Sequence, residues 1–197
     1  MKVAVLGATG LVGRQMLAVL ERRDFPVDQL VPLASSRSAG RRLPFRGQEI
    51  PVREVCEEAF EGVDLALFSA GSGPSRRWAP EAARRGAVVV DNSSAWRMDP
   101  EVPLVVPEVN GEDVRKHRGI IANPNCATIQ ALVALAPLHR EAGLEYLSAV
   151  TYQSVSGTGS AAVAELQEGA RAVLEGREGT PSVYPHPIAF NLLPHIG

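Results

Sequence analysis

The sequence predicts an α/β fold in which a doubly wound parallel sheet is covered by helices on both faces. Three observations indicate this class: short apolar runs rich in β-branched residues, helical patterns between those runs, and a glycine-rich turn between the first run and the first helix. Strands of such a sheet are buried on both sides and are therefore continuously apolar. Ligands of this fold class bind at the carboxyl ends of the strands, so the residues after each strand are the first candidates for a site.

Strands and helices are expected to alternate along the first part of the chain. Their apolar spacing predicts a strand at 2–7, a helix at 10–23, strands at 29–35 and 63–70, a helix at 74–86, and strands at 87–93 and 119–124.

The pattern changes after residue 125. The elements expected there are a helix at 127–143, a long apolar and aromatic strand at 144–157, and a helix at 160–176. We therefore expect a cofactor-binding domain at 1–125 and the beginning of an α+β catalytic and dimerisation domain at 126–197. The Pro-rich segment from Thr180 onward ends without a closing element, so the second domain is expected to be truncated.

Composition excludes several classes of protein. The formal net charge of −2 and the scattered Lys and Arg argue against a nucleic-acid-binding protein, which would carry a basic face. No apolar run in the sequence approaches the roughly 20 residues that span a bilayer, and the N-terminal run is too short for a signal peptide. Cys56 and Cys126 form no CxxC pair, so neither a zinc site nor a disulfide framework is indicated. We expect a cytoplasmic protein that contacts no membrane and binds no metal.

The stretch GATGLVG lies between the first strand and the first helix. Its GxxGxxG spacing is a variant of the dinucleotide fingerprint: the first glycine permits a tight turn, the second lets backbone N–H groups approach a pyrophosphate, and the third permits close packing of helix on strand. The helix N-terminus adds partial positive charge for the phosphates. A plain tight turn is the alternative, but the strand–turn–helix context favours a Rossmann-type cofactor site formed by Gly7, Thr9, Gly10, Leu11, Val12 and Gly13.

The loop after the second strand predicts which nicotinamide cofactor binds. An NAD site would place Asp or Glu there to hold the ribose 2′-hydroxyl, whereas this chain has SSRSAG. Arg37 can pair with a 2′-phosphate, and Ser35, Ser36 and Ser38 can donate hydrogen bonds to it. These residues favour NADP over the alternative, a solvated polar loop.

Cys126 stands between the turn ANPN and the start of the helix expected at 127–143. A thiol at a helix N-terminus lies in the positive field of the macrodipole, which favours the thiolate. By position alone, Cys126 fits either a nucleophile or an inert apolar residue. Cys56 has two glutamates beside it and no basic neighbour in sequence, and we interpret it as structural.

Six motifs follow one another along the chain: GATGLVG, SSRSAG, VDNSSAWRM, VPEVN, ANPNCATIQ and TYQSVSGTGSAAVAEL. In this order they resemble the aspartate-semialdehyde dehydrogenases of the bacterial type, over essentially the whole chain. The resemblance implies an NADP-dependent, homodimeric enzyme that reduces L-aspartyl 4-phosphate to L-aspartate 4-semialdehyde, reversibly. This reaction belongs to the biosynthesis of lysine, threonine, methionine and diaminopimelate.

Matched residue by residue, the resemblance implies roles at the reacting centre. The family's NPNC cysteine, here Cys126, attacks the aldehyde; hydride passes to NADP, and inorganic phosphate cleaves the resulting thioester. Asn125 matches a residue that holds the reacting acyl group, and Gln153 matches one that contacts the substrate. Arg97 matches the arginine that binds the attacking or leaving phosphate. The nicotinamide end of the cofactor meets a segment that matches Ser156 and Gly157.

The family's general base is a histidine in a region that has no counterpart in this sequence. His117 and His139 lie on polar helical stretches and are interpreted as surface residues, while His186 and His195 stand in the Pro-rich tail. Proton transfer typically contributes about 10²–10⁴-fold in rate. The activity of the 197-residue chain by itself therefore stays open.

Two alternatives remain open. N-acetyl-glutamyl-phosphate reductases also pair a glycine loop with a catalytic cysteine, but they typically carry a glycine before that cysteine and a different ribose loop. A non-catalytic module for NADP binding or dimerisation would bind cofactor without turnover, and the missing base favours it.

Overall fold

The computed structural model describes residues 1–194 and falls into two compact units, Met1–Ala149 and Val150–Gly197. The domain boundary expected after residue 125 stays a prediction. None of the helices in the described residues has the length and apolar character of a membrane-spanning segment.

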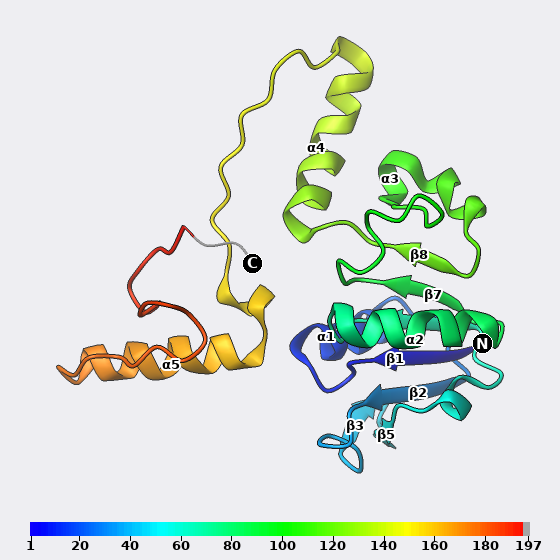
Figure 1. Ribbon diagram of the computed structural model, residues 1–197, viewed down its shortest axis with the longest axis horizontal. Coiled ribbons are helices and arrows are strands. Elements are labelled where there is room, and N and C mark those ends of the chain that lie inside the picture. The colour runs from blue at the N-terminus through cyan, green and yellow to red at the C-terminus, as the bar shows by residue number, and fades with distance from the viewer. Residues whose placement is uncertain (195–197) are drawn as a thin grey trace. The chain divides into compact units, whose positions relative to one another are not determined.

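The first unit contains a six-stranded parallel sheet in the order β5-β2-β1-β6-β7-β8 (Figure 1). This topology confirms the predicted doubly wound sheet. The five longer strands lie within the ranges expected from the sequence, whereas the two-residue β5 was not expected. The strands are β1 (Lys2–Leu6), β2 (Gln29–Ala34), β5 (Arg53–Glu54), β6 (Leu65–Phe68), β7 (Val88–Asp91) and β8 (Ile120–Ala122).

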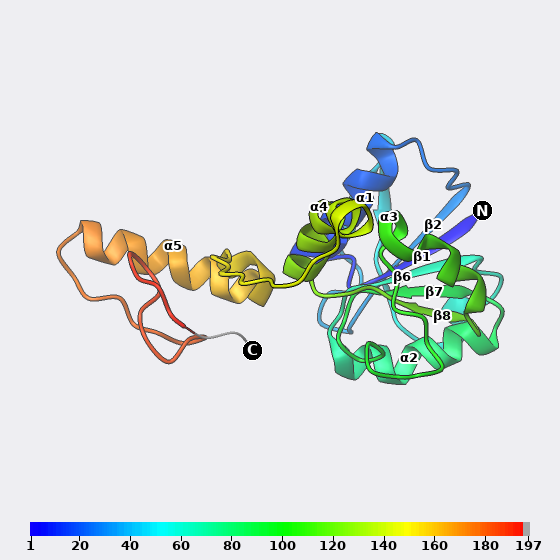
Figure 2. The same ribbon diagram turned by 90° about the horizontal axis from the view of Figure 1, so that it is seen from above.

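The helices α1 (Leu11–Arg22) and α2 (Ser72–Arg84) cover opposite faces of this sheet (Figure 2). Leu17 and Leu20 of α1 belong to a buried cluster with Val3 and Val5 of β1. The other face carries a second cluster, in which Trp78, Ala79 and Ala82 of α2 pack with alternate strand residues. The inner strands of the sheet therefore bury both of their faces, which is why they are continuously apolar.

An antiparallel hairpin of β3 (Arg42–Phe45) and β4 (Gln48–Pro51) was not predicted from the sequence. Its turn places Arg46 and Gly47 at φ values of 50° and 73°, the left-handed region that two-residue hairpin turns require. The Arg46 guanidinium compensates for this unfavourable backbone, because its Nη1 and Nη2 donate to the carbonyls of Val27 and Phe25 at 3.0 and 2.7 Å. The sequence indicates this hairpin only weakly, because an arginine rarely adopts the positive φ that such a turn requires.

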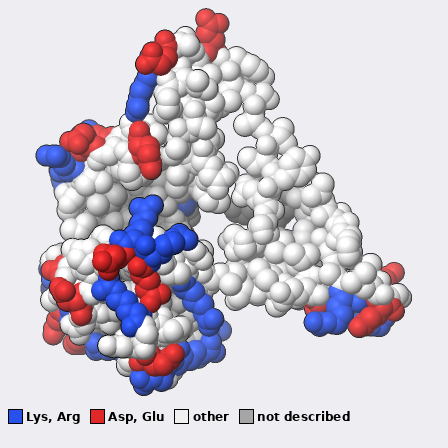
Figure 3. Space-filling view, turned by 180° about the vertical axis from the view of Figure 1, so that it is seen from behind, with Lys and Arg blue, Asp and Glu red and all other residues white. Residues whose placement is uncertain are grey.

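Shorter helical elements complete the first unit. They are the 3₁₀ helix η1 (Glu57–Phe60), α3 (Pro107–Asn110) and the 3₁₀ helix η2 (Gly111–Lys116). Cys56 precedes η1, is half-buried and packs against the cluster on the α2 face. On the molecular face shown in Figure 3, Lys and Arg are interspersed with Asp and Glu.

The two helices expected after residue 125 form, as α4 (Cys126–Ala142) and α5 (Ser160–Leu174), with a short 3₁₀ helix, η3 (Val155–Thr158), before α5. The long strand expected at 144–157 is wrong. Residues 143–154 belong to no helix or strand, and Tyr146, Val150 and Tyr152 are 82%, 81% and 79% exposed. A strand needs a neighbouring strand to complete its hydrogen bonds, and no segment of residues 1–194 pairs with this one.

The packing of α1 depends on Gly13. A Cβ on this residue would lie 2.1 Å from the carbonyl oxygen of Gly7, whereas at Gly10 the nearest atom is 3.2 Å away. We expect Gly13→Ala to lower the free energy of unfolding by at least about 2 kcal/mol, because backbone atoms must move apart. Gly10→Ala should cost less. The measurement is urea denaturation at 25 °C, followed by the fluorescence of the buried Trp78.

Gly73→Ala is the matched control, because it lies in α2 and a Cβ on this residue would meet nothing within 4 Å. Its stability should stay unchanged or rise by up to about 1 kcal/mol. Equal stabilities of Gly13→Ala and Gly73→Ala would contradict the packing argument.

Candidate functional site

The carboxyl ends of five strands meet at one edge of the sheet. In the strand register Leu6 pairs with Leu33 and with Phe68, Phe68 with Asp91, and Asp91 with Ala122. The chain runs from β1 to β2 in one direction and through β6, β7 and β8 in the other. The loops after β1 and β6 therefore flank a topological switch point, the position where open α/β sheets bind their ligands.

The glycine loop follows β1 and is tied to both neighbouring strands. Gly7 has φ 88° and donates its N–H to the carbonyl of Leu33 at 2.9 Å. A Cβ at Gly7 would lie 2.4 Å from the carbonyl oxygen of Ser69, in the loop after β6. Gly7 and Gly13 thus permit the close approach of strand, loop and helix that the dinucleotide fingerprint requires, so the loop fits a nicotinamide cofactor.

Two helix N-termini open onto this edge without a side-chain cap among the described residues. In α1 the N-cap is Gly10, and the N–H groups of Leu11, Val12 and Gly13 precede the first intrahelical hydrogen bond, from Arg14 to Gly10. Neither α1 nor α2 has an acidic residue in its first turn. Unpaired N–H groups at a helix start bind phosphate oxygens.

The N-terminus of α2 is a candidate that the sequence analysis missed. Its N-cap is Gly71, with φ 87°, and the N–H groups of Ser72 and Gly73 precede the first helical hydrogen bond, from Ser75 to Gly71. The stretch SAGSG at 69–73, which begins within the last two residues of the strand expected at 63–70, was the available signal. It is a generic strand–turn–helix sequence, so it attracted no prediction.

The loop predicted to bind the 2′-phosphate follows β2. Ser38 and Ala39 donate their N–H groups to the carbonyl of Ser35 at 2.9 and 3.1 Å, which folds the loop into a turn. Ser35, Ser36 and Arg37 are exposed. No acidic side chain is present between residues 34 and 41, so the loop offers positive charge and hydroxyl groups to a ligand.

Cys126 is exposed and is the first residue of α4, which begins one residue earlier than the helix expected at 127–143. Asn125 caps this helix: its Oδ1 accepts from the N–H groups of Ala127 and Thr128 at 2.9 and 3.2 Å. The cap fixes the orientation of the Asn125 amide, and its Nδ2 donor has no acceptor among the described residues. The thiol and this amide therefore belong to adjacent residues at the start of α4.

Arg97 is half-buried and joins the loops after β7 and β8. Its Nε donates to the carbonyl of Asn123 at 2.9 Å and its Nη2 to the carbonyl of Asn92 at 3.1 Å, while the Asn123 amide donates to Asn92 Oδ1 at 2.6 Å. Nε and Nη2 share one edge of the planar guanidinium. The Nη1–Nη2 edge stays available, and a guanidinium edge binds an oxyanion through two parallel hydrogen bonds.

The remaining predicted site residues belong to the second unit. Gln153 is exposed and donates from Nε2 to Thr151 Oγ1 at 3.2 Å. Ser156 and Gly157 lie in η3, whose start is capped by the Ser154 hydroxyl, which accepts from the Ser156 N–H. His195 lies outside the described residues.

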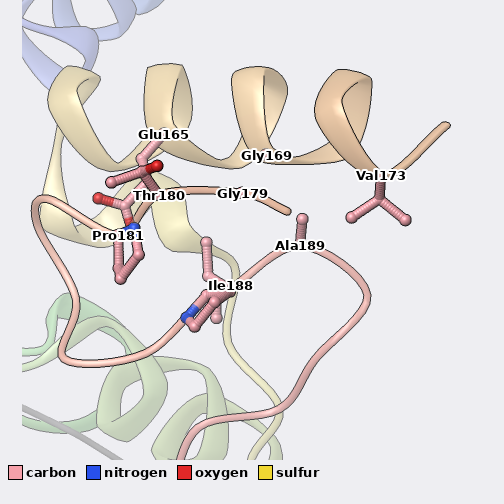
Figure 4. Close-up of a pocket in the computed structure, with 9 residues that line it drawn as sticks. Glu165, Gly169, Val173, Gly179, Thr180, Pro181, Ile188 and Ala189 are labelled. Carbon is pink, nitrogen blue, oxygen red and sulfur yellow. The ribbon is translucent and has the colours of Figure 1, made fainter. Parts of the chain in front are cut away.

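A small cavity of about 20 Å³ lies within the second unit, between α5 and the segment 179–189 (Figure 4). None of the predicted site residues lines it. At its rim Glu165 is 9% exposed, and its Oε2 accepts from the N–H and hydroxyl of Ser182 at 2.7 and 2.9 Å and from the N–H of Val183. The hydrogen bond from the Val183 N–H is the largest cause of a pKa below the ordinary 4.5 for this carboxyl.

Comparisons with known proteins show the family of this chain. Residues 2–117 match the sequence model of the semialdehyde dehydrogenase NAD binding domain, and residues 135–197 match that of the semialdehyde dehydrogenase dimerisation domain. The chain belongs to the semialdehyde dehydrogenase family. Within this family it is 56% identical to the aspartate-semialdehyde dehydrogenase of Aquifex aeolicus and 52% identical to that of Bacillus subtilis.

The alignments cover 99% and 98% of this chain but only 58% of each of those two proteins. The chain thus spans a little over half the length of these curated semialdehyde dehydrogenases. A crystal structure of aspartate semialdehyde dehydrogenase II from Vibrio cholerae, complexed with ASA, is 48% identical with a TM-score of 0.96, over 99% of this chain and 59% of that one. A Candida albicans structure with NADP is 30% identical with a TM-score of 0.62, over 73% and 48%.

The Glu165 contacts predict an acid-sensitive second unit. Because the folded pKa lies below the ordinary value, the ionised carboxyl stabilises the fold above about pH 4.5, and this contribution is lost as the pH falls through the folded pKa. We expect the hydrogen-exchange protection of the Ser182 and Val183 N–H groups to decrease between pH 5 and pH 3. Glu165→Gln should reduce the protection already at pH 6 and remove most of its pH dependence.

Glu168→Gln is the control, because Glu168 is an exposed residue of the same helix that pairs with Arg171. It should behave as the parent does. Protection that changes with pH equally in parent and Glu165→Gln would contradict the assignment.

Proposed function

We propose that this chain carries the NADP site and the reacting cysteine of an aspartate-semialdehyde dehydrogenase, which reduces L-aspartyl 4-phosphate to L-aspartate 4-semialdehyde and works reversibly. The observation that carries the proposal is the position of Cys126. It lies on the first turn of a capped helix after β8, at the sheet edge where the glycine loop lies after β1. In the sheet β8 is the third strand from β1, so the two strands lie about 14 Å apart at about 4.8 Å for each neighbouring pair.

Cys126 is the nucleophile in this proposal. Its thiolate attacks the aldehyde carbon, and a thioester on Cys126 results once hydride has left that carbon. A phosphate oxygen then attacks the thioester carbon, the acyl phosphate forms, and the thiolate leaves. When bound, NADP supplies the hydride acceptor. In this proposal the Asn125 amide, whose Oδ1 is held by the helix cap, donates to the oxyanion that forms in both attacks.

Arg97 is the phosphate-binding residue in this proposal. Its Nε edge is held by two backbone carbonyls, so the position of the guanidinium is fixed before any ligand arrives. The free edge can bind two oxygens of the attacking phosphate or of the acyl phosphate at once. For Gln153 the family resemblance supports a contact with the substrate, and for Ser156 and Gly157 a contact with the nicotinamide.

NADP is the proposed cofactor, because Arg37 and the neighbouring serines occupy the place where an NAD site has a carboxylate. A homodimer is proposed as well. The dimerisation-domain match at 135–197 supports it, as do the exposed Tyr146, Leu147 and Tyr152, a hydrophobic set of the kind that interfaces bury. The cytoplasmic location expected from the sequence, and the role in lysine, threonine, methionine and diaminopimelate biosynthesis, stay predictions.

Arg37→Ala tests the cofactor assignment. Since only NADP carries the 2′-phosphate, we expect its Kd to rise about 10–100-fold while that of NAD changes less than about threefold. Titration calorimetry or cofactor fluorescence measures both. Arg22→Ala, which removes an equal charge at the far end of α1, should leave both constants unchanged. Equal losses for NADP and NAD would exclude Arg37 from a 2′-phosphate site.

Cys126→Ser tests the nucleophile. In the dimer with its complete catalytic region, phosphate-dependent NADPH formation from aspartate semialdehyde should fall at least about 10³-fold, because an alcohol replaces the thiolate. NADP binding should be retained, and Cys56→Ser should keep turnover.

Loss of NADP binding in Cys126→Ser would instead indicate a structural cysteine. Cofactor binding by the parent without any turnover would favour the non-catalytic module.

A further inference from the structure

The loop from Asn92 to Arg97 is fixed at both of its ends. One residue before Arg97, Trp96 Nε1 donates to the hydroxyl of Ser75, a fully buried residue of α2, at 2.9 Å. At its end the Arg97 guanidinium holds the carbonyls of Asn92 and Asn123. The orientation of Arg97 therefore depends on the shape of this short loop.

A buried carboxylate stands at the root of the loop. Asp91, the last residue of β7, is 0% exposed. Its Oδ2 accepts from the Ser93 hydroxyl at 2.6 Å, and the Ser93 oxygen in turn accepts from the N–H of Ala95 at 3.1 Å. No donor among residues 1–194 reaches the Asp91 Oδ1. Burying a carboxylate with an unpaired oxygen is costly, so a neutral apolar residue would serve a purely structural position better.

The hydrogen bonds from the Ala95 N–H to Ser93 and from the Ser93 hydroxyl to Asp91 form a relay, and the carboxylate fixes its direction. A carboxylate only accepts hydrogen bonds, so the Ser93 hydroxyl has to donate to Asp91, and the lone pairs of its oxygen are left for the Ala95 N–H. An amide or hydroxyl at position 91 could donate to Ser93 and leave the direction undetermined. The 2.6 Å distance is in the range of strong O–H···O⁻ bonds. The relay thus holds the backbone two residues before Arg97.

We propose that Asp91 is a positioning residue that acts on Arg97 through Ser93. By fixing the turn at 93–95 it keeps the Nε edge of Arg97 on the carbonyls of Asn92 and Asn123 and leaves the opposite edge for a phosphate. The functional meaning of this inference rests on the proposed phosphate role of Arg97, whereas the positioning itself can be measured without turnover.

The test follows the Arg97 Nε–H signal by NMR in the ¹⁵N-labelled full chain, with inorganic phosphate as the probe. Ser93→Ala removes the relay, and we expect the Nε–H to exchange with water at least about tenfold faster and to respond less to phosphate. Asp91→Asn keeps an acceptor at position 91, so the exchange rate of the Arg97 Nε–H should rise only about threefold. Asp113→Asn is the matched control, because Asp113 also accepts side-chain hydrogen bonds, from Asn110 and Lys116. It should leave the signal unchanged.

If Ser93→Ala folds and its Arg97 Nε–H exchanges as slowly as in the parent, the proposal is overturned. A lower free energy of unfolding in that variant would then show only that Ser93 stabilises the fold. If Ser93→Ala does not fold, Asp91→Asn decides: faster exchange supports the relay, and parent-like exchange contradicts it. The Arg97 signal of the parent could stay unchanged on addition of phosphate while exchange is faster in Ser93→Ala. That result would refute the phosphate role of Arg97 and support its positioning by Asp91 and Ser93.

Discussion

The close approach of α1 to the loop after β1 is the constraint on which the candidate site depends. Only glycine at position 13 lets the helix come so near that a Cβ would lie 2.1 Å from the Gly7 oxygen. This contact places the free N–H groups of Leu11 to Gly13 at the sheet edge. Gly7 has the same function on the other side, where the loop meets the backbone of Ser69. The close packing of strand, loop and helix at this edge therefore depends on Gly7 and Gly13, which carry no side chain.

The three helix N-termini at this edge differ in a way that fits the proposed chemistry. Those of α1 and α2 have no side-chain cap within the described residues, so their N–H groups can meet a charged ligand. The start of α4 is capped by Asn125, so Cys126 is held at a helix end whose next N–H groups are already satisfied. The first two starts suit a dinucleotide, and the third presents a nucleophile with one oriented amide donor. Arg97 is fixed by backbone carbonyls beside them, so the site needs little rearrangement before a ligand binds.

Much of the fold and part of the candidate site could be predicted from the sequence, because the patterns that indicate them lie within short stretches of the chain. Continuous apolar runs located five parallel strands, and the spacing of Gly7, Gly10 and Gly13 located the turn that joins strand to helix. The position of Cys126 at a helix start followed from ANPN before an apolar helix. The predictions that were wrong or missing concern elements that depend on contacts with residues far along the chain. The segment 144–157 has the composition of a strand, but no strand of residues 1–194 lies beside it. The turn of the hairpin is stabilised by Arg46, whose side chain reaches carbonyls about twenty residues away. The roles of Asn92, Asn123 and Asp91 were not visible either, since they arise from register between β7 and β8.

The central claim is that NADP binds across the two uncapped helix starts at this edge. Titration of NADP into the ¹⁵N-labelled chain, followed through backbone amide shifts, tests it most directly. We predict the largest shifts at residues 11–13 and 72–73, whose N–H groups precede the first helical hydrogen bonds and can bind phosphate oxygens. A further set at 35–38 should shift with NADP and not with NAD. Saturable binding that leaves both helix starts unshifted, or identical shifts at 35–38 with NAD, would contradict the account.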